Sequence, residues 1–316
     1  MSTLKMNSED VQLARKASLL KQEFTEHLLP VLLALAACTV VLLGAFASPA
    51  QASTSSDDVR IISTDAGTTE ILVALGQGES LVGIDVTSSV PDTLTPAKVG
   101  YHRQLAAEGL LSLAPTIVFG SEHIGPKETV NALKSANTQL VLQPTATDSQ
   151  QLIENIQQVA EALKLSGDQL VDQVQSAQHI LDKNLDKSSD KRLDKASSGR
   201  STKAVFLLYL EGRGLKQAGL GTSGDSLLNL LGLENVSSHS NYRSVSAEGL
   251  MTMQPEVILI GSQNPKAAEA LLAQFPSLSH TPAVENNKVL FVDAAALVSG
   301  ISLKAMEEAV RVSEAL

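Results

Sequence analysis

Short apolar runs alternate with segments of helical periodicity through the first half of the chain. Runs of strand length, rich in Ile, Val and Leu, cover residues 60–63, 81–84, 117–119 and 140–142. Between the first two, a run of Ile, Leu and Ala follows Thr68 and Thr69 and ends at Gly76, which is the composition of a capped helix. Strands that alternate with helices form parallel, doubly wound sheets. The pattern therefore predicts an α/β lobe.

A long polar segment follows. Residues 149–198 contain no proline and a single glycine, Gly167. Apolar residues then recur at spacings of three and four, which draws one apolar stripe along a helix. The stripe consists of Leu170, Val174, Ala177, Leu181 and Leu185. We expect a backbone helix over residues 166–198 that joins two lobes, one over residues 53–165 and one over residues 199–316.

The second half repeats the plan of the first. Strands are predicted over residues 204–210, 257–260 and 289–292, and helices over 226–231, 266–274 and 303–312. Six residues also recur at a constant displacement of 140 positions. They are Arg103, Ala107, Glu108, Gly109, Leu110 and Pro115, which return as Arg243, Ala247, Glu248, Gly249, Leu250 and Pro255. A fixed offset indicates two related lobes. The predicted fold class is α/β, with two Rossmann-like lobes of mainly parallel sheet, and a ligand site is expected in the cleft between them.

The amino-terminal residues have the pattern of an export signal. Residues 28–46 are apolar and uncharged, and an A-x-A pattern ends at Ala52. We expect cleavage after Ala52, so that residues 1–52 are a signal peptide and the mature chain lies in the periplasm. Cys38 lies in a lipobox-like context, but apolar residues continue beyond it, so a lipid anchor there is the less favoured interpretation.

Composition narrows the function classes. The 316 residues carry a net charge of -10, which argues against a nucleic-acid partner. One cysteine excludes a disulfide framework and a cysteine-based metal site. The glycine-rich segment at 219–224 fits G-x-G-x-x-G but begins too far past its strand for a dinucleotide site. No P-loop, nucleophile elbow or H-E-x-x-H occurs, so a binding protein is predicted and not an enzyme.

The segment Val99-Gly100-Tyr101-His102-Arg103, followed by Ala107-Glu108-Gly109, carries a family resemblance. It resembles the haemin-binding members of the periplasmic proteins that serve ABC importers and that have a helical backbone between two lobes. The resemblance implies that Tyr101, in a G-Y-x-R motif, is the axial ligand of ferric haem b iron, with Arg103 beside it. A phenolate is a hard anionic donor that suits ferric iron. Arg103 has two open roles, since a guanidinium can stabilise the phenolate or pair with a haem propionate.

Further candidates lie in loops on the cleft side of the predicted lobes and at the end of the first strand of the second lobe. His102, Thr87 and Ser88 are expected to make polar contacts in the first lobe, and Tyr209 is the candidate from the second lobe, although a buried core tyrosine is an equal interpretation. Aliphatic walls are expected at Val86, Leu105, Ile124 and Leu215, because only 3% of the residues are aromatic. A single haem is the default, since the second lobe has no histidine at the end of its first strand.

The resemblance also implies partners. Glu108 and Glu248 are expected to dock onto an ABC permease with its ATPase, although a glutamate that stabilises the first turn of a helix is the alternative. An outer-membrane haem receptor is expected upstream, and the protein is expected to act as a monomer. Two alternative functions stay open: a ferric siderophore or cobalamin binding protein of the same fold, and a haem scavenger or chaperone that needs no permease.

Overall fold

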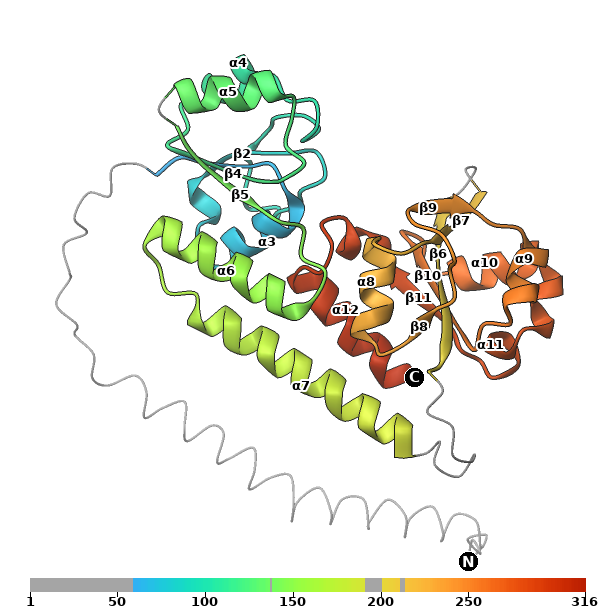
Figure 1. The fold of residues 1–316 in the computed structure, drawn as a ribbon. Helices are drawn as coiled ribbons and strands as arrows, with labels where there is room; N and C mark the ends of the chain where they lie inside the picture. The colour runs from blue at the N-terminus through green and yellow to red at the C-terminus, as the bar shows by residue number, and fades with distance from the viewer. Residues whose placement is uncertain (1–58, 137, 191–200, 211–213) are drawn as a thin grey trace, which may run out of the picture. The chain divides into compact units, whose positions relative to one another are not determined.

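Two sheets, each in its own lobe, form the frame of the computed structural model (Figure 1). The structure describes residues 59–136, 138–190, 201–210 and 214–316, and the predicted signal peptide lies outside them. No helix in these ranges is long and apolar enough to cross a membrane. The described residues belong to one compact unit, residues 57–316.

The first lobe contains an all-parallel sheet in the order β3-β2-β1-β4-β5. Its strands are β1 (Ile61–Ser63), β2 (Leu81–Ile84), β3 (Ala97–Lys98), β4 (Ile117–Ser121) and β5 (Gln139–Gln143). Its helices are α3 (Ala66–Ala74), α4 (Ala107–Leu111), α5 (Lys127–Ser135) and α6 (Ser149–Leu163), with a 3-10 turn, η2, at Gly78–Ser80. Every residue of β1 and β4 is buried, as expected for central strands covered on both faces.

The second lobe contains a mostly parallel sheet in the order β11-β10-β6-β7-β9, with β8 paired to β6. Its strands are β6 (Lys203–Leu210), β7 (Gly214–Ala218), β8 (Glu234–Asn235), β9 (Tyr242–Ser244), β10 (Val257–Ser262) and β11 (Val289–Asp293). Its helices are α8 (Ser223–Leu230), α9 (Ala247–Met253), α10 (Ala267–Gln274), α11 (Pro282–Glu285) and α12 (Leu303–Ala315), with 3-10 turns η4 (Pro276–His280) and η5 (Ala294–Leu297). Strands β7 and β9, which periodicity does not predict, are its antiparallel members.

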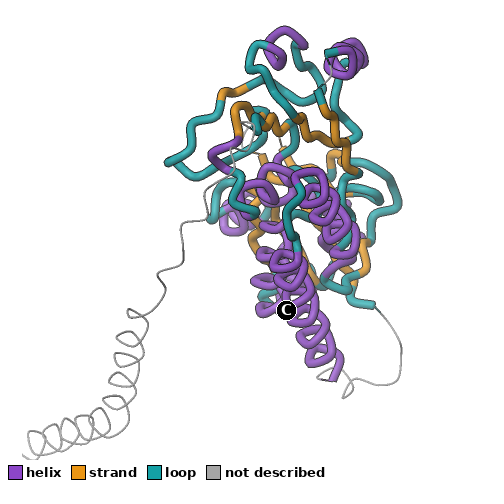
Figure 2. The backbone as a smooth tube through the Cα atoms, turned by 90° about the vertical axis from the view of Figure 1, so that its left-hand side faces the viewer, coloured by secondary structure: helices purple, strands orange, loops and turns teal. Residues whose placement is uncertain are grey.

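The predicted backbone helix is α7 (Asp168–Asp190), and the polar segment before it forms the separate helix α6. Gly167 lies in the connection between them, where a Cβ would approach Ile156 and Ala160 at 3.2 Å. The stripe of α7 is buried as predicted, with Leu170, Val174 and Leu181 at most 5% exposed. Figure 2 shows helical segments stacked in front of the strands.

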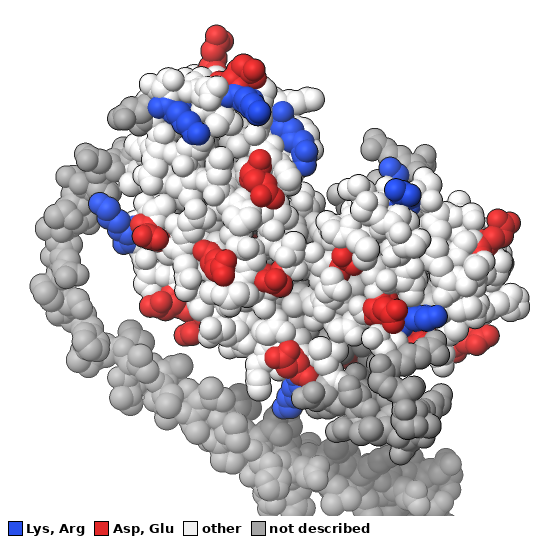
Figure 3. Space-filling view, in the orientation of Figure 1, with Lys and Arg blue, Asp and Glu red and all other residues white. Residues whose placement is uncertain are grey.

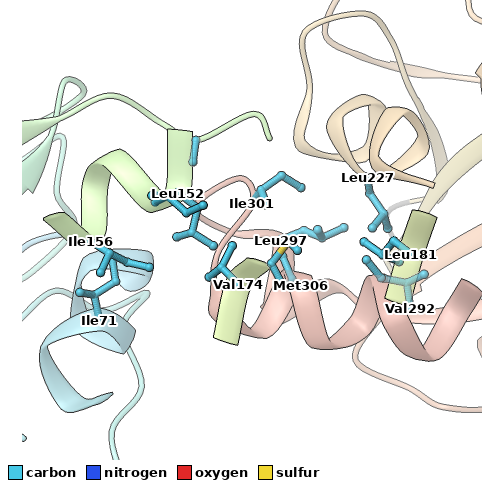
Figure 4. Close-up of a cluster of buried hydrophobic side chains, with 14 of the residues drawn as sticks. Ile71, Leu152, Ile156, Val174, Leu181, Leu227, Val292, Leu297, Ile301 and Met306 are labelled. Atoms are coloured by element: carbon cyan, nitrogen blue, oxygen red, sulfur yellow. The ribbon is translucent and has the colours of Figure 1, made fainter. Parts of the chain in front are cut away.

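One apolar core joins the lobes through α7 and α12. It includes Ile71 and Ile156 from the first lobe, Leu181 from α7, and Leu227 and Met306 from the second lobe (Figure 4). At about 25 cal/mol per Å² of apolar surface, such burial is the main stabilising contribution to the contact between the lobes. The lobes therefore have a continuous hydrophobic connection, which holds the loops on either side of the cleft.

The 140-residue repeat is visible in the structure. Leu110 and Leu250 are both fully buried, in α4 and α9. After each helix the chain passes through a left-handed residue, Ala114 with φ 45° and Gln254 with φ 49°, and then enters the central strand through a buried proline. The same backbone path at the same offset shows that the repeated residues build the same supersecondary unit twice.

Candidate functional site

A cavity of about 540 Å³ opens between the lobes. The first lobe contributes Val86 and Thr87, which follow β2, and the second lobe contributes residues from five segments of its chain. Those residues are Phe206, Leu208, Ser223, Tyr242, Gln263, Ala294, Ala295, Leu297 and Val298. In the space-filling view a hollow separates the lobes, and mostly uncharged residues border it on the face shown (Figure 3). Its size and apolar lining with a few polar groups are typical of small-molecule sites.

The loop that carries Tyr101 lies against this cavity. The Val86 amide donates a hydrogen bond to the Gly100 carbonyl at 2.9 Å, which joins the cavity wall to the residue before Tyr101. Gly100 has φ 104°, a conformation that favours glycine. This turn leads to Tyr101, a residue that is 42% exposed and so differs from a packed core aromatic. The Tyr101 hydroxyl has no hydrogen-bond partner among the described residues, so its oxygen is available to a ligand.

A buried carboxylate lies under this loop. The side chain of Asp85 is 0% exposed and accepts four hydrogen bonds from Thr87, Ser88 and His102. Its Oδ1 accepts from the amide of Ser88 at 3.0 Å and from the hydroxyl of Ser88 at 2.5 Å. Its Oδ2 accepts from the Thr87 hydroxyl at 2.6 Å and lies 3.2 Å from Nδ1 of His102. Asp85 therefore brings together three of the predicted site residues.

The other predicted residues have different surroundings. Arg103 is exposed and its side chain makes no ion pair within the described ranges, so its guanidinium is available to a bound anion. Glu108 and Glu248 are exposed in the first turns of α4 and α9. Ser246 caps α9 by accepting from the Gly249 amide, whereas Ala106 offers α4 no such cap, so the two glutamates stand at unequal helix ends.

Tyr209 points away from the cavity. Along β6, Phe206 and Leu208 line the cleft, and the alternation of the strand turns Tyr209 to the other face. There it packs against a separate apolar cluster and its hydroxyl donates to Gln274 at 3.3 Å. The core interpretation of Tyr209 is the one that the structure supports, and we leave it out of the proposed site.

Two of the expected wall residues are corrected in the same way. Leu105 is 3% exposed and Leu215 is 6% exposed, and each packs inside the core of its own lobe. Ile124 packs against the same core as Leu105, and only Val86 lines the cavity. Leu105 and Ile124 lie in loops and Leu215 lies in β7, but all three pack against a core, and sequence spacing does not separate such positions from cleft positions.

Tyr242 is a cavity residue that the sequence did not single out. Its ring lines the cleft from β9, and its hydroxyl lies 3.3 Å from both Oγ of Ser223 and the amide of Gly224 at the start of α8. These two contacts hold the ring in place. An aromatic residue in an otherwise polar segment just before the repeated residues was the available signal.

The described ranges contain no group of three or more His, Cys, Asp or Glu side chains placed to hold a metal ion. The burial of Glu70, on α3 away from the cleft, raises the pKa of its carboxyl, although the Lys304 amide donates to it at 3.1 Å.

Known proteins of the same fold include several haem-binding proteins. The periplasmic haem-binding protein HutB of Vibrio cholerae is 34% identical, with 82% of this chain and 98% of that chain covered and a TM-score of 0.68. A periplasmic haem-binding protein from Pseudomonas aeruginosa is 30% identical over 81% of this chain and 92% of that chain, with a TM-score of 0.64. The vitamin B12 binding protein BtuF of Vibrio cholerae is 18% identical over 81% of this chain and 95% of that chain, with a TM-score of 0.63, which shows the fold alone.

The family assignment rests on the sequence as well as on the fold. No match appears among curated protein sequences. The sequence pattern of the periplasmic binding proteins matches residues 61–296, from β1 to the 3-10 turn after β11. That range contains the Tyr101 loop and most of the cleft. The chain therefore belongs to the periplasmic binding protein family, a family without enzymatic activity.

Proposed function

We propose that this protein binds one ferric haem in the cleft between its lobes and delivers it to an ABC permease in the inner membrane. The observation that carries the proposal is the exposed Tyr101, presented by a G-Y-x-R loop that is hydrogen bonded to the wall of an apolar cavity. The haem-binding relatives at 34% and 30% identity support the same ligand. Secretion to the periplasm after cleavage at Ala52 is part of this proposal.

The chemistry of the site suits an iron porphyrin. The phenolate oxygen of Tyr101 is the proposed axial ligand, because an anionic oxygen donor favours ferric iron. Val86, Leu208 and Val298 offer aliphatic surface to the macrocycle, and Tyr242 offers an aromatic ring. Arg103, exposed beside the ligand, is the proposed partner of the phenolate or of a propionate, with a bidentate geometry that suits a carboxylate. Thr87, Ser223 and Gln263 bring polar groups to the cavity walls.

A siderophore or a cobalamin is the alternative ligand. The relative that binds vitamin B12 has only 18% identity and brings no ligand argument. Either alternative makes Tyr101 a wall residue without a bond to iron. Tyr101 is exposed, and its hydroxyl has no hydrogen-bond partner in the described part of the chain. This favours haem as the ligand, because a residue that only lines the wall of a site has no need of a free hydroxyl.

A haemin titration of the purified protein tests the proposed ligand. We expect a saturable absorbance change with one haem per chain and a ferric high-spin spectrum with a phenolate charge-transfer band. Cobalamin and a ferric catecholate siderophore serve as competitors and should leave the haem spectrum unchanged. A spectrum of free haemin throughout the titration, with saturable binding of either competitor, would refute the haem assignment.

Delivery to a permease is the second half of the proposal. Glu108 and Glu248 are exposed at equivalent places of the two lobes, so they form two separated negative contacts suited to arginines of a permease. Such charges act mainly on orientation and encounter rate. The double variant Glu108→Lys with Glu248→Lys should keep the haem affinity of the parent and abolish haem uptake by cells or by vesicles that contain the transporter. Normal uptake by this variant would favour a haem scavenger that needs no permease.

A further inference from the structure

The residues around Asp85 form a chain of contacts that ends at the Tyr101 ring. The imidazole of His102 lies between them: its Nδ1 is 3.2 Å from Oδ2 of Asp85, and its ring centroid is 4.3 Å from that of Tyr101 at an interplanar angle of 50°. A carboxylate oxygen can only accept, so Nδ1 is the nitrogen that carries the hydrogen. The His102 ring therefore donates to Asp85 through Nδ1 and packs beside the Tyr101 ring.

Asp85 has the surroundings of a fixed anchor. Its side chain is fully buried and all four of its hydrogen bonds come from the loop after β2 and from His102. Two further hydrogen bonds fix Ser88, which itself donates to Asp85. The Thr69 hydroxyl donates to the Ser88 hydroxyl at 2.8 Å, and the Lys98 ammonium donates to the Ser88 carbonyl at 2.7 Å. Burial of a carboxylate is costly unless it is satisfied by such donors. These hydrogen bonds together fix the position of the Asp85 carboxylate.

The His102 side chain is hydrogen bonded to Asp85, whereas the Tyr101 side chain has no hydrogen-bond partner among the described residues. The His102 carbonyl accepts from the Gly125 amide at 2.9 Å, and its side chain is only 17% exposed. Tyr101 has a 42% exposed side chain, and its ring has one aromatic neighbour among the described residues, His102. Loss of the imidazole would therefore remove the aromatic contact that Tyr101 makes within the described part of the chain.

We propose that Asp85 and His102 are positioning residues for Tyr101, with the buried carboxylate fixing the imidazole and the imidazole fixing the direction of the phenol. This inference rests on the proposed function, because it concerns the aim of the oxygen that binds iron. Partners behind a metal ligand commonly fix its orientation, and their loss changes metal affinity by about 10- to 100-fold. Neither residue contacts iron in this account.

The test separates the hydrogen bond of His102 from its ring. His102→Phe keeps a ring beside Tyr101 and loses the bond to Asp85, whereas His102→Gln keeps a donor and loses the ring. We expect haem to dissociate about 10-fold faster from His102→Ala than from the parent, with His102→Phe and His102→Gln between the two. Asp85→Asn should resemble His102→Phe. Transfer of haem to apomyoglobin measures the rate, and the position of the charge-transfer band reports the iron–phenolate bond.

A matched control and a folding control accompany these variants. Glu122 and His123 form a second acid–histidine contact in the same lobe at 3.7 Å, but both side chains are about half exposed. His123→Ala should leave the rate and the spectrum unchanged. Thermal unfolding without haem shows whether Asp85→Asn folds. If that variant does not fold, the three His102 variants decide the test, because His102 lies at the outer end of the network, next to Tyr101.

The outcomes distinguish this inference from the proposed function. Parent-like rates and spectra in His102→Ala and in a folded Asp85→Asn, with the charge-transfer band lost in Tyr101→Ala, would overturn the positioning role alone. Retention of the band in Tyr101→Ala would overturn both, since another residue would then be the ligand. A parent spectrum without the phenolate band, typical of an imidazole-ligated ferric haem, that is lost in His102→Ala and kept in Tyr101→Ala would make His102 the ligand and refute its positioning role.

Discussion

The two lobes have the same frame but present different groups to the cleft. Helices α4 and α9, the left-handed residues Ala114 and Gln254, and the central strands that follow recur at one offset. The residues just before the repeated arginines differ. The first lobe has a Gly100–Tyr101 turn over a buried aspartate, and the second has strand β9, whose Tyr242 is held at the start of α8. The repeated frame thus carries one exposed tyrosine without a hydrogen-bond partner among the described residues, and one tyrosine that lines the cleft and is hydrogen bonded to α8.

The largest expected effect separates these two tyrosines. Tyr101→Ala should weaken haem binding by at least about 100-fold, because it removes the proposed ligand atom, whereas Tyr242→Ala should weaken it by about 10-fold through lost contact. Equilibrium titration with haemin measures both. Equal losses in the two variants would show that the lobes contribute alike and would break the comparison.

The shared frame predicts equal costs at equivalent core positions. Leu110 and Leu250 are both 0% exposed, so Leu110→Ala and Leu250→Ala should each reduce the free energy of unfolding by about 2–5 kcal/mol. Denaturation in urea without ligand gives the values. A cost below about 1 kcal/mol in one lobe only would show that the two units are packed differently.

Glu70, where α3 contacts α12, makes the free energy of unfolding depend on pH. Burial raises the pKa of its carboxyl above 4.5, so the folded state favours the protonated form. The stabilisation of the folded state by protonated Glu70 is therefore complete below pH 4.5, and it is lost as the pH rises through the folded pKa. The Glu70→Gln variant should lack this part of the pH dependence and gain stability relative to the parent toward neutral pH. Denaturation curves at several pH values test the sign, and a parent that gains on the variant as the pH rises would contradict it.

The smallest effect compares the two left-handed residues. The left-handed conformation costs a residue with a Cβ about 1 kcal/mol relative to glycine. Replacement by glycine removes this cost, but glycine also loses more chain entropy on folding, which cancels part of the gain in stability. Ala114→Gly should raise the free energy of unfolding by less than about 1 kcal/mol. Gln254→Gly should raise it less, because the Gln254 side chain donates to the Met251 carbonyl at 2.7 Å. A larger gain at Gln254, measured by urea denaturation, would count against this difference.

Periodic patterns predicted the frame, and the site was only partly predictable. The stripe of α7 and the buried strands were visible because burial imposes a period on the sequence. Strands β7 and β9 were missed because polar residues interrupt their apolar pattern, Lys216 and Gln217 in β7 and Arg243 and Ser244 in β9. The motif singles out Tyr101, and its role stays a prediction, but no motif singles out Asp85, since an aspartate in a loop is usually solvated. An aspartate followed by Thr87 and Ser88 directly after a buried strand was the available signal.

The most direct test of the central claim removes one oxygen atom. Tyr101→Phe keeps the ring beside His102 and takes away the hydroxyl that we propose as the iron ligand. The parent protein titrated with haemin should give a ferric high-spin spectrum with a phenolate charge-transfer band, and Tyr101→Phe should lack that band and bind haem far more weakly. The same band and the same affinity in Tyr101→Phe would contradict the claim that this protein captures haem through Tyr101.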